Sequence, residues 1–227
     1  MSTRLCVSIP PKTVDEAFDL IQQAEEQHAD IIEVRLDSLQ DYKRLADIAT
    51  VSKTPLIATN KSTQQNGSFS GTEQERQKVL TDAAKTGFSY IDIDLGTPYQ
   101  KELIRSLKDY GSKVIVSYHD FQSTPSLLTL SNVLDEQLSL GSNVCKLITT
   151  AKKVEDNLAV LNFVSDASKL AEVVCFAMGE LGKTSRLLSP VFGAFFTFAC
   201  LDETKKTANG QLTIQEMKQA YETLGIK

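Results

Sequence analysis

Apolar residues along this chain gather in short runs, and longer stretches with helical spacing separate one run from the next. Short runs rich in β-branched side chains are typical of buried strands, whereas apolar residues at intervals of three and four indicate helices. The predicted strands are residues 5–9, 31–36, 55–59, 90–95, 113–118, 143–150, 172–178 and 194–200. The predicted helices are residues 14–24, 41–51, 72–86, 98–110, 125–140, 154–165, 185–191 and 213–224.

The limits of several helices carry their own signals. A threonine followed three residues later by glutamate predicts a capping box, and this pattern occurs at Thr13 with Glu16 and at Thr213 with Glu216. Pro98 is expected in the first turn of its helix, where its missing N–H is not needed. Glycine favours the left-handed backbone that ends a helix, which we expect at Gly87, Gly111 and Gly141.

Strands that alternate with helices favour parallel pairing through right-handed crossovers. Eight of each predict a (β/α)8 barrel, a single domain over residues 1–227. The alternative is a doubly wound open sheet. It is less favoured because Pro10 and Pro11 follow the first strand in place of a glycine-rich phosphate loop.

Charge and composition narrow the choice of partner and compartment. A net charge of −5 argues against broad binding to nucleic acid or to anionic membranes, and no apolar run approaches membrane-spanning length. No signal sequence is recognised at the start, so we expect a cytoplasmic protein. The four cysteines fall in apolar runs without C-x-x-C spacing, which favours buried reduced thiols over disulfides or metal ligands.

Lys146 lies in the middle of an apolar strand, where a charged side chain is costly. Burial disfavours the ammonium form and is expected to lower the amine pKa, which would make Lys146 a nucleophile toward carbonyl carbon. The alternative is a lysine on an edge strand whose stem covers apolar surface while its head reaches water.

Further polar residues stand where the predicted strands end, and a barrel of this kind places its active site there. Glu33 and Arg35 share one face of a strand, as active-site residues or as an ion pair that fills the barrel. His119 ends the strand before that of Lys146 and could act as an acid and base. Arg186 could bind a carboxylate or phosphate. The remaining polar residues of this set include Ser8, Asp37, Asp92 and Asp94. Two histidines and isolated cysteines do not supply zinc spacing.

Several short motifs follow one another in order along the chain: Glu33-Val34-Arg35-Leu36-Asp37, Ser117-Tyr118-His119-Asp120-Phe121, Lys146 in its strand, Met178-Gly179, Ser185-Arg186, Val191-Phe192-Gly193 and Gly210-Gln211. Together they resemble the type I 3-dehydroquinate dehydratases of the shikimate pathway. The resemblance extends from Ser8 to the last helix.

This resemblance implies dehydration of 3-dehydroquinate to 3-dehydroshikimate without a cofactor or metal, on a barrel that commonly forms a homodimer. Lys146 would form an imine with the substrate ketone, and His119 would move the protons. The remaining positions that match the family are expected to bind substrate: Ser8, Glu33, Arg35 and Lys61 line its site, and Arg186, Thr207 and Gln211 hold its carboxylate.

Two departures from the family pattern concern the loop after the third strand. Lys61 stands where arginine is usual, and it keeps the charge without the bidentate fork. Gln65 stands where glutamate is usual and cannot ionise to tune His119. In the last loop, Thr207 replaces serine and Asn209 replaces proline.

Two other functions stay open at this point. An aldolase-type lysine-imine lyase on the same barrel would need a phosphate site after strands seven and eight. A catalytically weakened barrel would bind dehydroquinate without turning it over. Family members also occur fused to a shikimate dehydrogenase, and residues 60–71 have the length and polarity of an active-site lid.

Overall fold

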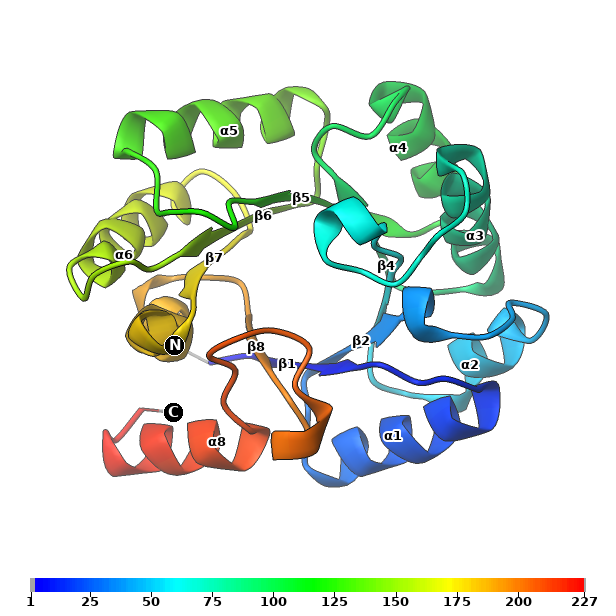
Figure 1. Cartoon of the computed structure of the whole chain (residues 1–227), viewed down its shortest axis with the longest axis horizontal. Helices are drawn as coiled ribbons and strands as arrows, with labels where there is room; N and C mark the ends of the chain where they lie inside the picture. Colours follow the sequence, from blue (N-terminus) through cyan, green and yellow to red (C-terminus); the bar gives the residue numbers. More distant parts are fainter. Residues whose placement is uncertain (1–2, 227) are drawn as a thin grey trace.

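The computed structural model describes residues 3–226, in which eight strands alternate with eight α-helices (Figure 1). The strands are β1 (Leu5–Ile9), β2 (Ile31–Arg35), β3 (Leu56–Thr59), β4 (Tyr90–Asp94), β5 (Lys113–His119), β6 (Val144–Thr150), β7 (Val173–Met178) and β8 (Thr197–Ala199). The helices are α1 (Val14–Glu26), α2 (Leu45–Val51), α3 (Glu73–Thr86), α4 (Gln100–Asp109), α5 (Leu127–Ser139), α6 (Asp156–Ala167), α7 (Lys183–Leu188) and α8 (Ile214–Thr223).

The strands form one parallel sheet in the order β7-β6-β5-β4-β3-β2-β1-β8. The sheet curls until its two ends meet, and the predicted (β/α)8 barrel is confirmed. At the junction between β7 and β8, which we call the seam, the two strands are not paired as neighbours in the described chain. A backbone hydrogen bond of 2.8 Å from Phe195 to Val173 links the segments there.

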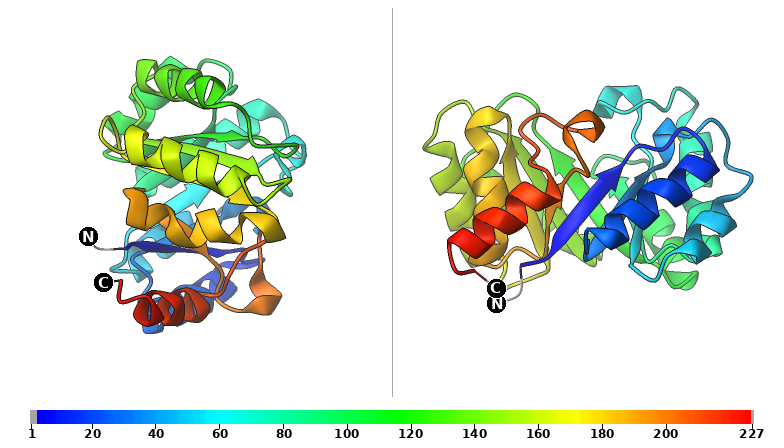
Figure 2. Two further views of the ribbon diagram at one scale, coloured as in Figure 1. Left: turned by 90° about the vertical axis from the view of Figure 1, so that its left-hand side faces the viewer. Right: turned by 90° about the horizontal axis from the view of Figure 1, so that it is seen from below.

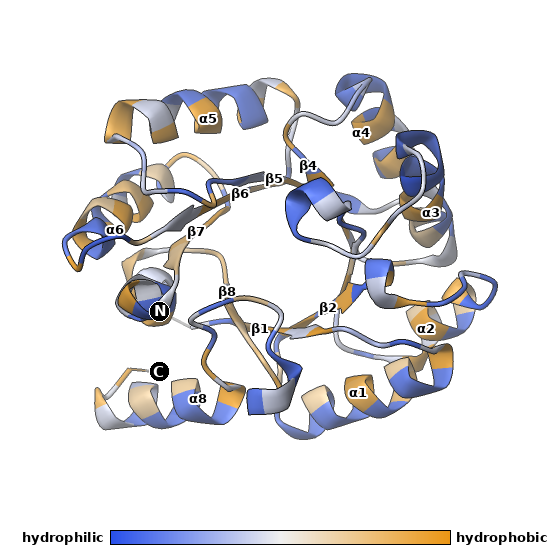
Figure 3. Ribbon diagram, viewed as in Figure 1, coloured by the Kyte–Doolittle hydropathy of each residue, from blue (hydrophilic) through white to orange (hydrophobic). Residues whose placement is uncertain are grey.

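Alternation of side chains along the strands creates two cores. One face packs against the surrounding helices, whose hydrophobic sides are turned toward the sheet in Figure 3. The other face fills the barrel, mainly with aliphatic residues and with Phe176, Phe196 and Phe198. Within residues 3–226, no helix has the length and hydrophobicity needed to cross a bilayer.

Most of the predicted helix limits are confirmed, with local exceptions. Thr213 and Glu216 form the expected capping box, and Gly87, Gly111 and Gly141 take positive φ after their helices. At α1 the Thr13 hydroxyl caps as predicted, but the Glu16 carboxylate accepts from the Lys12 N–H instead of the Thr13 N–H. Four helices, α2, α4, α5 and α6, begin two or more residues later than predicted. Pro98 precedes α4, because left-handed Tyr99 (φ 55°) interrupts the helix before Gln100, and α2 begins only at Leu45.

The loops that follow the strands gather at one end of the barrel. In the right-hand view of Figure 2 the segments after β3 and β8 lie at the top, opposite the start of β1 and the end of α8. This end therefore collects polar side chains both from the strands and from the loops that follow them.

Candidate active site

A cavity of about 390 Å³ opens at the carboxyl end of the strands. Nine residues were predicted to be catalytic or substrate-binding, and eight of them line this cavity: Glu33, Arg35, Lys61, His119, Lys146, Arg186, Thr207 and Gln211. The ninth, Ser8, is buried on β1 and donates a hydrogen bond to Glu33, which it holds in place. The fold thus brings together residues that are spread over most of the chain.

Lys146 is 5% exposed on β6, which lies between β5 and β7, so the edge-strand interpretation is wrong. Its Nζ lies 2.8 Å from Asp92 Oδ2 and 3.5 Å from Glu33 Oε1, over the ring of Phe198. Burial lowers the pKa of Lys146, but the carboxylates of Asp92 and Glu33 outweigh burial and raise it. The expectation of a lowered pKa is therefore wrong, because it could not include carboxylates that other strands supply.

Glu33 and Arg35 share a strand face but have different partners. Glu33 accepts a hydrogen bond from the Thr59 hydroxyl at 2.9 Å as well as the one from Ser8. Arg35 makes a bidentate contact with Asp37, at 2.8 and 2.7 Å. The described residues contain no direct ion pair between Glu33 and Arg35, so the interpretation of that pair as a barrel plug is wrong.

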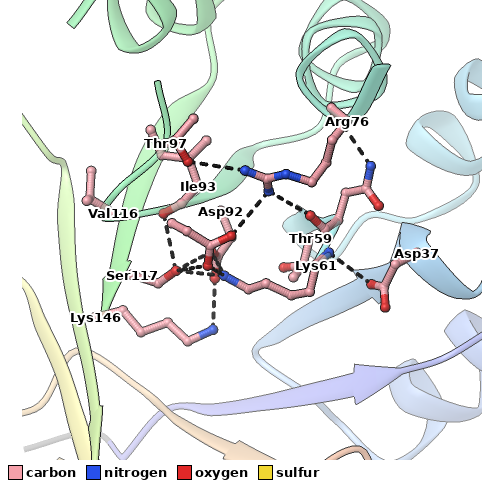
Figure 4. Close-up of polar contacts among 12 residues, drawn as sticks. Asp37, Thr59, Lys61, Arg76, Asp92, Ile93, Thr97, Val116, Ser117 and Lys146 are labelled. Carbon is pink, nitrogen blue, oxygen red and sulfur yellow. Dashed lines mark hydrogen bonds and ion pairs between the residues drawn. The ribbon is translucent and has the colours of Figure 1, made fainter. Parts of the chain in front are cut away.

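Asp92 is fully buried at the centre of the charged network drawn in Figure 4. Its Oδ1 accepts from Lys61 Nζ at 2.8 Å and its Oδ2 from Lys146 Nζ at 2.8 Å. Burial alone would raise the pKa of Asp92, but the two ammonium groups have the larger effect and lower it well below its usual value. Asp92 is therefore an ionised carboxylate. Asp92 lies within β4 and was recognisable as a polar strand residue from the sequence, but its role as the shared partner of two lysines was not.

His119 ends β5, and its ring stacks on Phe121 with centroids 5.6 Å apart. Its Nδ1 is buried and has no hydrogen-bond partner among residues 3–226. Burial lowers the pKa of His119 well below its usual value, and the positive charges of Lys61 and Lys146 lower it further. His119 is therefore a neutral imidazole at neutral pH, which can accept a proton.

Arg186 is 1% exposed on α7, and its guanidinium lies 4.2 Å from the ring centroid of Phe176. Nη2 donates a long hydrogen bond of 3.4 Å to the Asn209 carbonyl, whereas Nε and Nη1 have no acceptor in residues 3–226. Burial lowers the pKa of Arg186 to about 9. A buried cation with free donors beside a cavity is a site for an anion.

The loop after β8 completes this part of the cavity. Gln211 Oε1 accepts from the N–H groups of Thr207 (2.7 Å) and Ala208 (3.2 Å), which fixes the turn around Asn209. Gly210 is required here, since its φ is 73° and a Cβ would lie 2.3 Å from the carbonyl oxygen of Gly179. The loop therefore lies directly beside the segment that leads into α7.

The loop at residues 60–71 has a defined structure. Asp37 accepts hydrogen bonds from the N–H groups of Lys61 (3.3 Å) and Ser68 (3.0 Å), and Phe69 N–H donates to the Lys61 carbonyl at 3.1 Å. Gln65 ends a short 3-10 turn and lines the cavity. Asp37 therefore links this loop to Arg35.

Comparison with known proteins agrees with this geometry. The type I 3-dehydroquinase family matches residues 5–227. A 3-dehydroquinate dehydratase of Desulfotalea psychrophila is 34% identical over 223 residues, which cover 97% of each chain. A bifunctional 3-dehydroquinate dehydratase/shikimate dehydrogenase of Arabidopsis thaliana is 33% identical over 96% of this chain and 36% of its own length. The crystal structure of a 3-dehydroquinate dehydratase from Geobacillus kaustophilus has the same fold, with a TM-score of 0.91 at 21% identity over 99% of this chain and 92% of that one. The chain therefore belongs to the type I 3-dehydroquinase family.

Proposed function

We propose that this protein dehydrates 3-dehydroquinate to 3-dehydroshikimate through an imine on Lys146. One observation carries the proposal beyond family membership. The cavity holds the amine of Lys146, the neutral imidazole of His119 and the guanidinium of Arg186, whose Nε and Nη1 have no acceptor among the described residues. A keto acid presents a carbonyl carbon to the amine and a carboxylate to the guanidinium.

The chemistry divides between Lys146 and His119. Lys146 gives up a proton and attacks the ketone as the free amine. That proton returns to the hydroxyl of the addition product, which departs as water and leaves a protonated imine that makes the adjacent C–H acidic. His119 takes the C2 proton and then protonates the leaving C1 hydroxyl, which departs as water. Hydrolysis of the imine consumes one water and frees the product, so the net reaction is the loss of one water molecule.

The other residues are proposed to bind and orient the substrate. Arg186 would bind the carboxylate with Thr207 and Gln211, whose loop lies beside it. Glu33 and Arg35, the former held by Ser8, would bind substrate hydroxyl groups from the β2 side. A planar guanidinium with two free donors suits a carboxylate at least as well as a phosphate, which favours the dehydratase over an aldolase-type lyase.

We also propose that the protein is a homodimer in the cytoplasm. Exposed Leu128, Val154, Leu158 and Leu181 lie at the ends of α5, α6 and α7 nearest the cavity, a surface that a second copy could cover. The four cysteines are buried and free, as suits a reducing compartment. Leu158→Glu should lower the mass measured by light scattering. Leu170→Glu, exposed at the opposite end of α6, is the control.

The test is incubation with 3-dehydroquinate and borohydride, followed by peptide mapping. The expected result is a reduced adduct on the peptide that contains Lys146, with formation of the conjugated product followed by absorbance in parallel. Lys146→Ala should abolish both signals, and Lys78→Met, an exposed lysine of α3, should change neither. Binding without adduct or product would indicate a catalytically weakened barrel and reject the proposal.

A further inference from the structure

The ammonium group of Lys61 has three protons and three acceptors within the protein. It lies 2.8 Å from Asp92 Oδ1 and 2.8 Å from the Ser117 hydroxyl (Figure 4). It also donates to Asp94 Oδ1. All its donors are therefore used, and the side chain is buried. Although Lys61 lines the cavity, no donor remains for a substrate unless one of these contacts is broken.

Asp94 is itself held from behind by α3. Arg76 Nη1 donates to Asp94 Oδ2 at 3.2 Å and to the Asn60 carbonyl at 2.9 Å. The same guanidinium pairs with Glu73 at 2.7 and 2.8 Å. These contacts fix Asp94, and through it the amine of Lys61, against the bottom of the cavity.

Lys61 and Lys146 bind opposite oxygens of one carboxylate, that of Asp92. Asp92 favours the ammonium form of Lys146, whereas attack on a ketone requires the free amine. A second cation on the other oxygen offsets the charge of Asp92 and opposes its hold on the Lys146 proton. The other titratable or charged groups around Asp92 and the two amines are Cys6, Glu33, Arg35, His119, Asp94 and Arg76.

We propose that Lys61 is a positioning residue that acts on Lys146 through Asp92, by weakening the attraction of that carboxylate for the Lys146 proton. Lys61 thus favours the nucleophilic amine and does not hold the substrate directly. This inference rests on the proposed function, because a more nucleophilic Lys146 matters for catalysis only if Lys146 forms an imine with the substrate. Its physical content, a lower proton affinity at Lys146, can be measured without any substrate.

The experiment is competitive labelling of the lysines with acetic anhydride across a pH series, with the Lys146 peptide quantified by mass spectrometry. Lys61→Met should lower Lys146 labelling at a fixed pH by about tenfold, which corresponds to a rise of about one unit in its pKa. Lys61→Arg keeps the charge and should restore labelling to near the wild-type level. Lys78→Met is the matched control on the surface.

Asp94→Asn provides a change of opposite sign. It removes a negative charge from Lys61 and leaves that cation to Asp92 alone, so Lys146 labelling should increase at the same pH. A general disturbance of packing would move both variants in one direction. Circular dichroism establishes whether each variant is folded. If Lys61→Met does not fold, Lys146 labelling in the two single variants Asp94→Asn and Lys61→Arg tests the inference.

Unchanged Lys146 labelling in Lys61→Met, or in Asp94→Asn if the former does not fold, would overturn the inference. A shift of both variants in the same direction would also overturn it. With substrate, a direct binding role would appear as a raised KM with labelling unaffected, which likewise rejects it. Failure of the dehydratase proposal would show instead as missing turnover while the labelling shifts persist.

Discussion

Replacing Arg186 with methionine should make the protein more stable and nearly inactive. The guanidinium is buried, two of its nitrogens have no acceptor in residues 3–226, and its one polar contact is the 3.4 Å bond to Asn209. Methionine keeps the unbranched stem and removes the charge. The fold then no longer holds a desolvated cation that only a bound anion can neutralise.

The magnitude follows from the pKa of Arg186, which burial lowers to about 9. At about 1.4 kcal/mol for each pKa unit, the buried charge costs roughly 5 kcal/mol. The cation–π contact with Phe176 offsets about 2 kcal/mol of this. The bond to Asn209 and imperfect repacking reduce the gain further, to a net stabilisation of about 2 kcal/mol. For a domain of this size the melting temperature should rise by about 4–8 °C.

Thermal melting followed by circular dichroism measures the stability, and steady-state kinetics measure the loss of function. In Arg186→Met the substrate carboxylate no longer has a cationic partner. The variant should lose about 2–5 kcal/mol of substrate binding, which is roughly 30-fold to several-thousand-fold in kcat/KM. Arg105→Met, on the exposed side of α4, is the control and should change neither. A lower melting temperature for Arg186→Met would refute the reasoning, because it would mean that the guanidinium stabilises the empty fold.

Three further predictions concern the cap, the histidine and the loop. Thr213→Ala removes a capping box and should lower the free energy of unfolding by about 1 kcal/mol in urea titration; an unchanged value would contradict the role of this cap. The lowered pKa of His119 places the acid limb of activity below the usual histidine range near pH 6.5, and Gln65→Glu should move that limb to higher pH, as pH–rate profiles would show. Burial alone would raise the pKa of Asp37, but the contact with Arg35 has the larger effect, and the net pKa is lowered. The stabilisation from ionised Asp37 is therefore complete above about pH 4 and is lost as the pH falls below that value. Asp37→Asn removes the charge that binds the N–H groups of Lys61 and Ser68, so residues 60–71 should become sensitive to limited proteolysis at neutral pH. Equal cleavage rates for the variant and the wild type would show that Asp37 does not hold the loop.

The fold was largely accessible from the sequence because each strand and helix carries a local signal. The apolar runs, the Thr213 box and the glycines after helices depend on neighbours a few positions away. The cavity residues at the strand ends were found because parallel strands in a barrel deliver their carboxyl ends to one place. Thr207 and Gln211, in the loop after β8, were indicated only by the resemblance to the family.

The electrostatics of the site were not accessible in this way. Lys146 and Asp92 are 54 positions apart, and Lys61 and Asp94 are 33 apart, so no local pattern pairs them. Arg76 on α3 gives no sequence signal for its contact with Asp94, because its spacing fits an ordinary amphipathic helix. The direction of the Lys146 pKa follows from these pairings, which is why the sequence-based expectation had the wrong sign.

The seam between β7 and β8 has a consequence for how the barrel moves. Arg186 lies on the helix that connects these two strands, and residues 207–211 follow β8. Within residues 3–226, β8 is the shortest strand and pairs along β1 only, so its amides should exchange with solvent faster than those of β5 or β6. An anion held between Arg186 and the last loop would bridge the seam. An anion bound in the cavity would then reduce local opening of the barrel at the seam. The expected observation is slower amide exchange along β8.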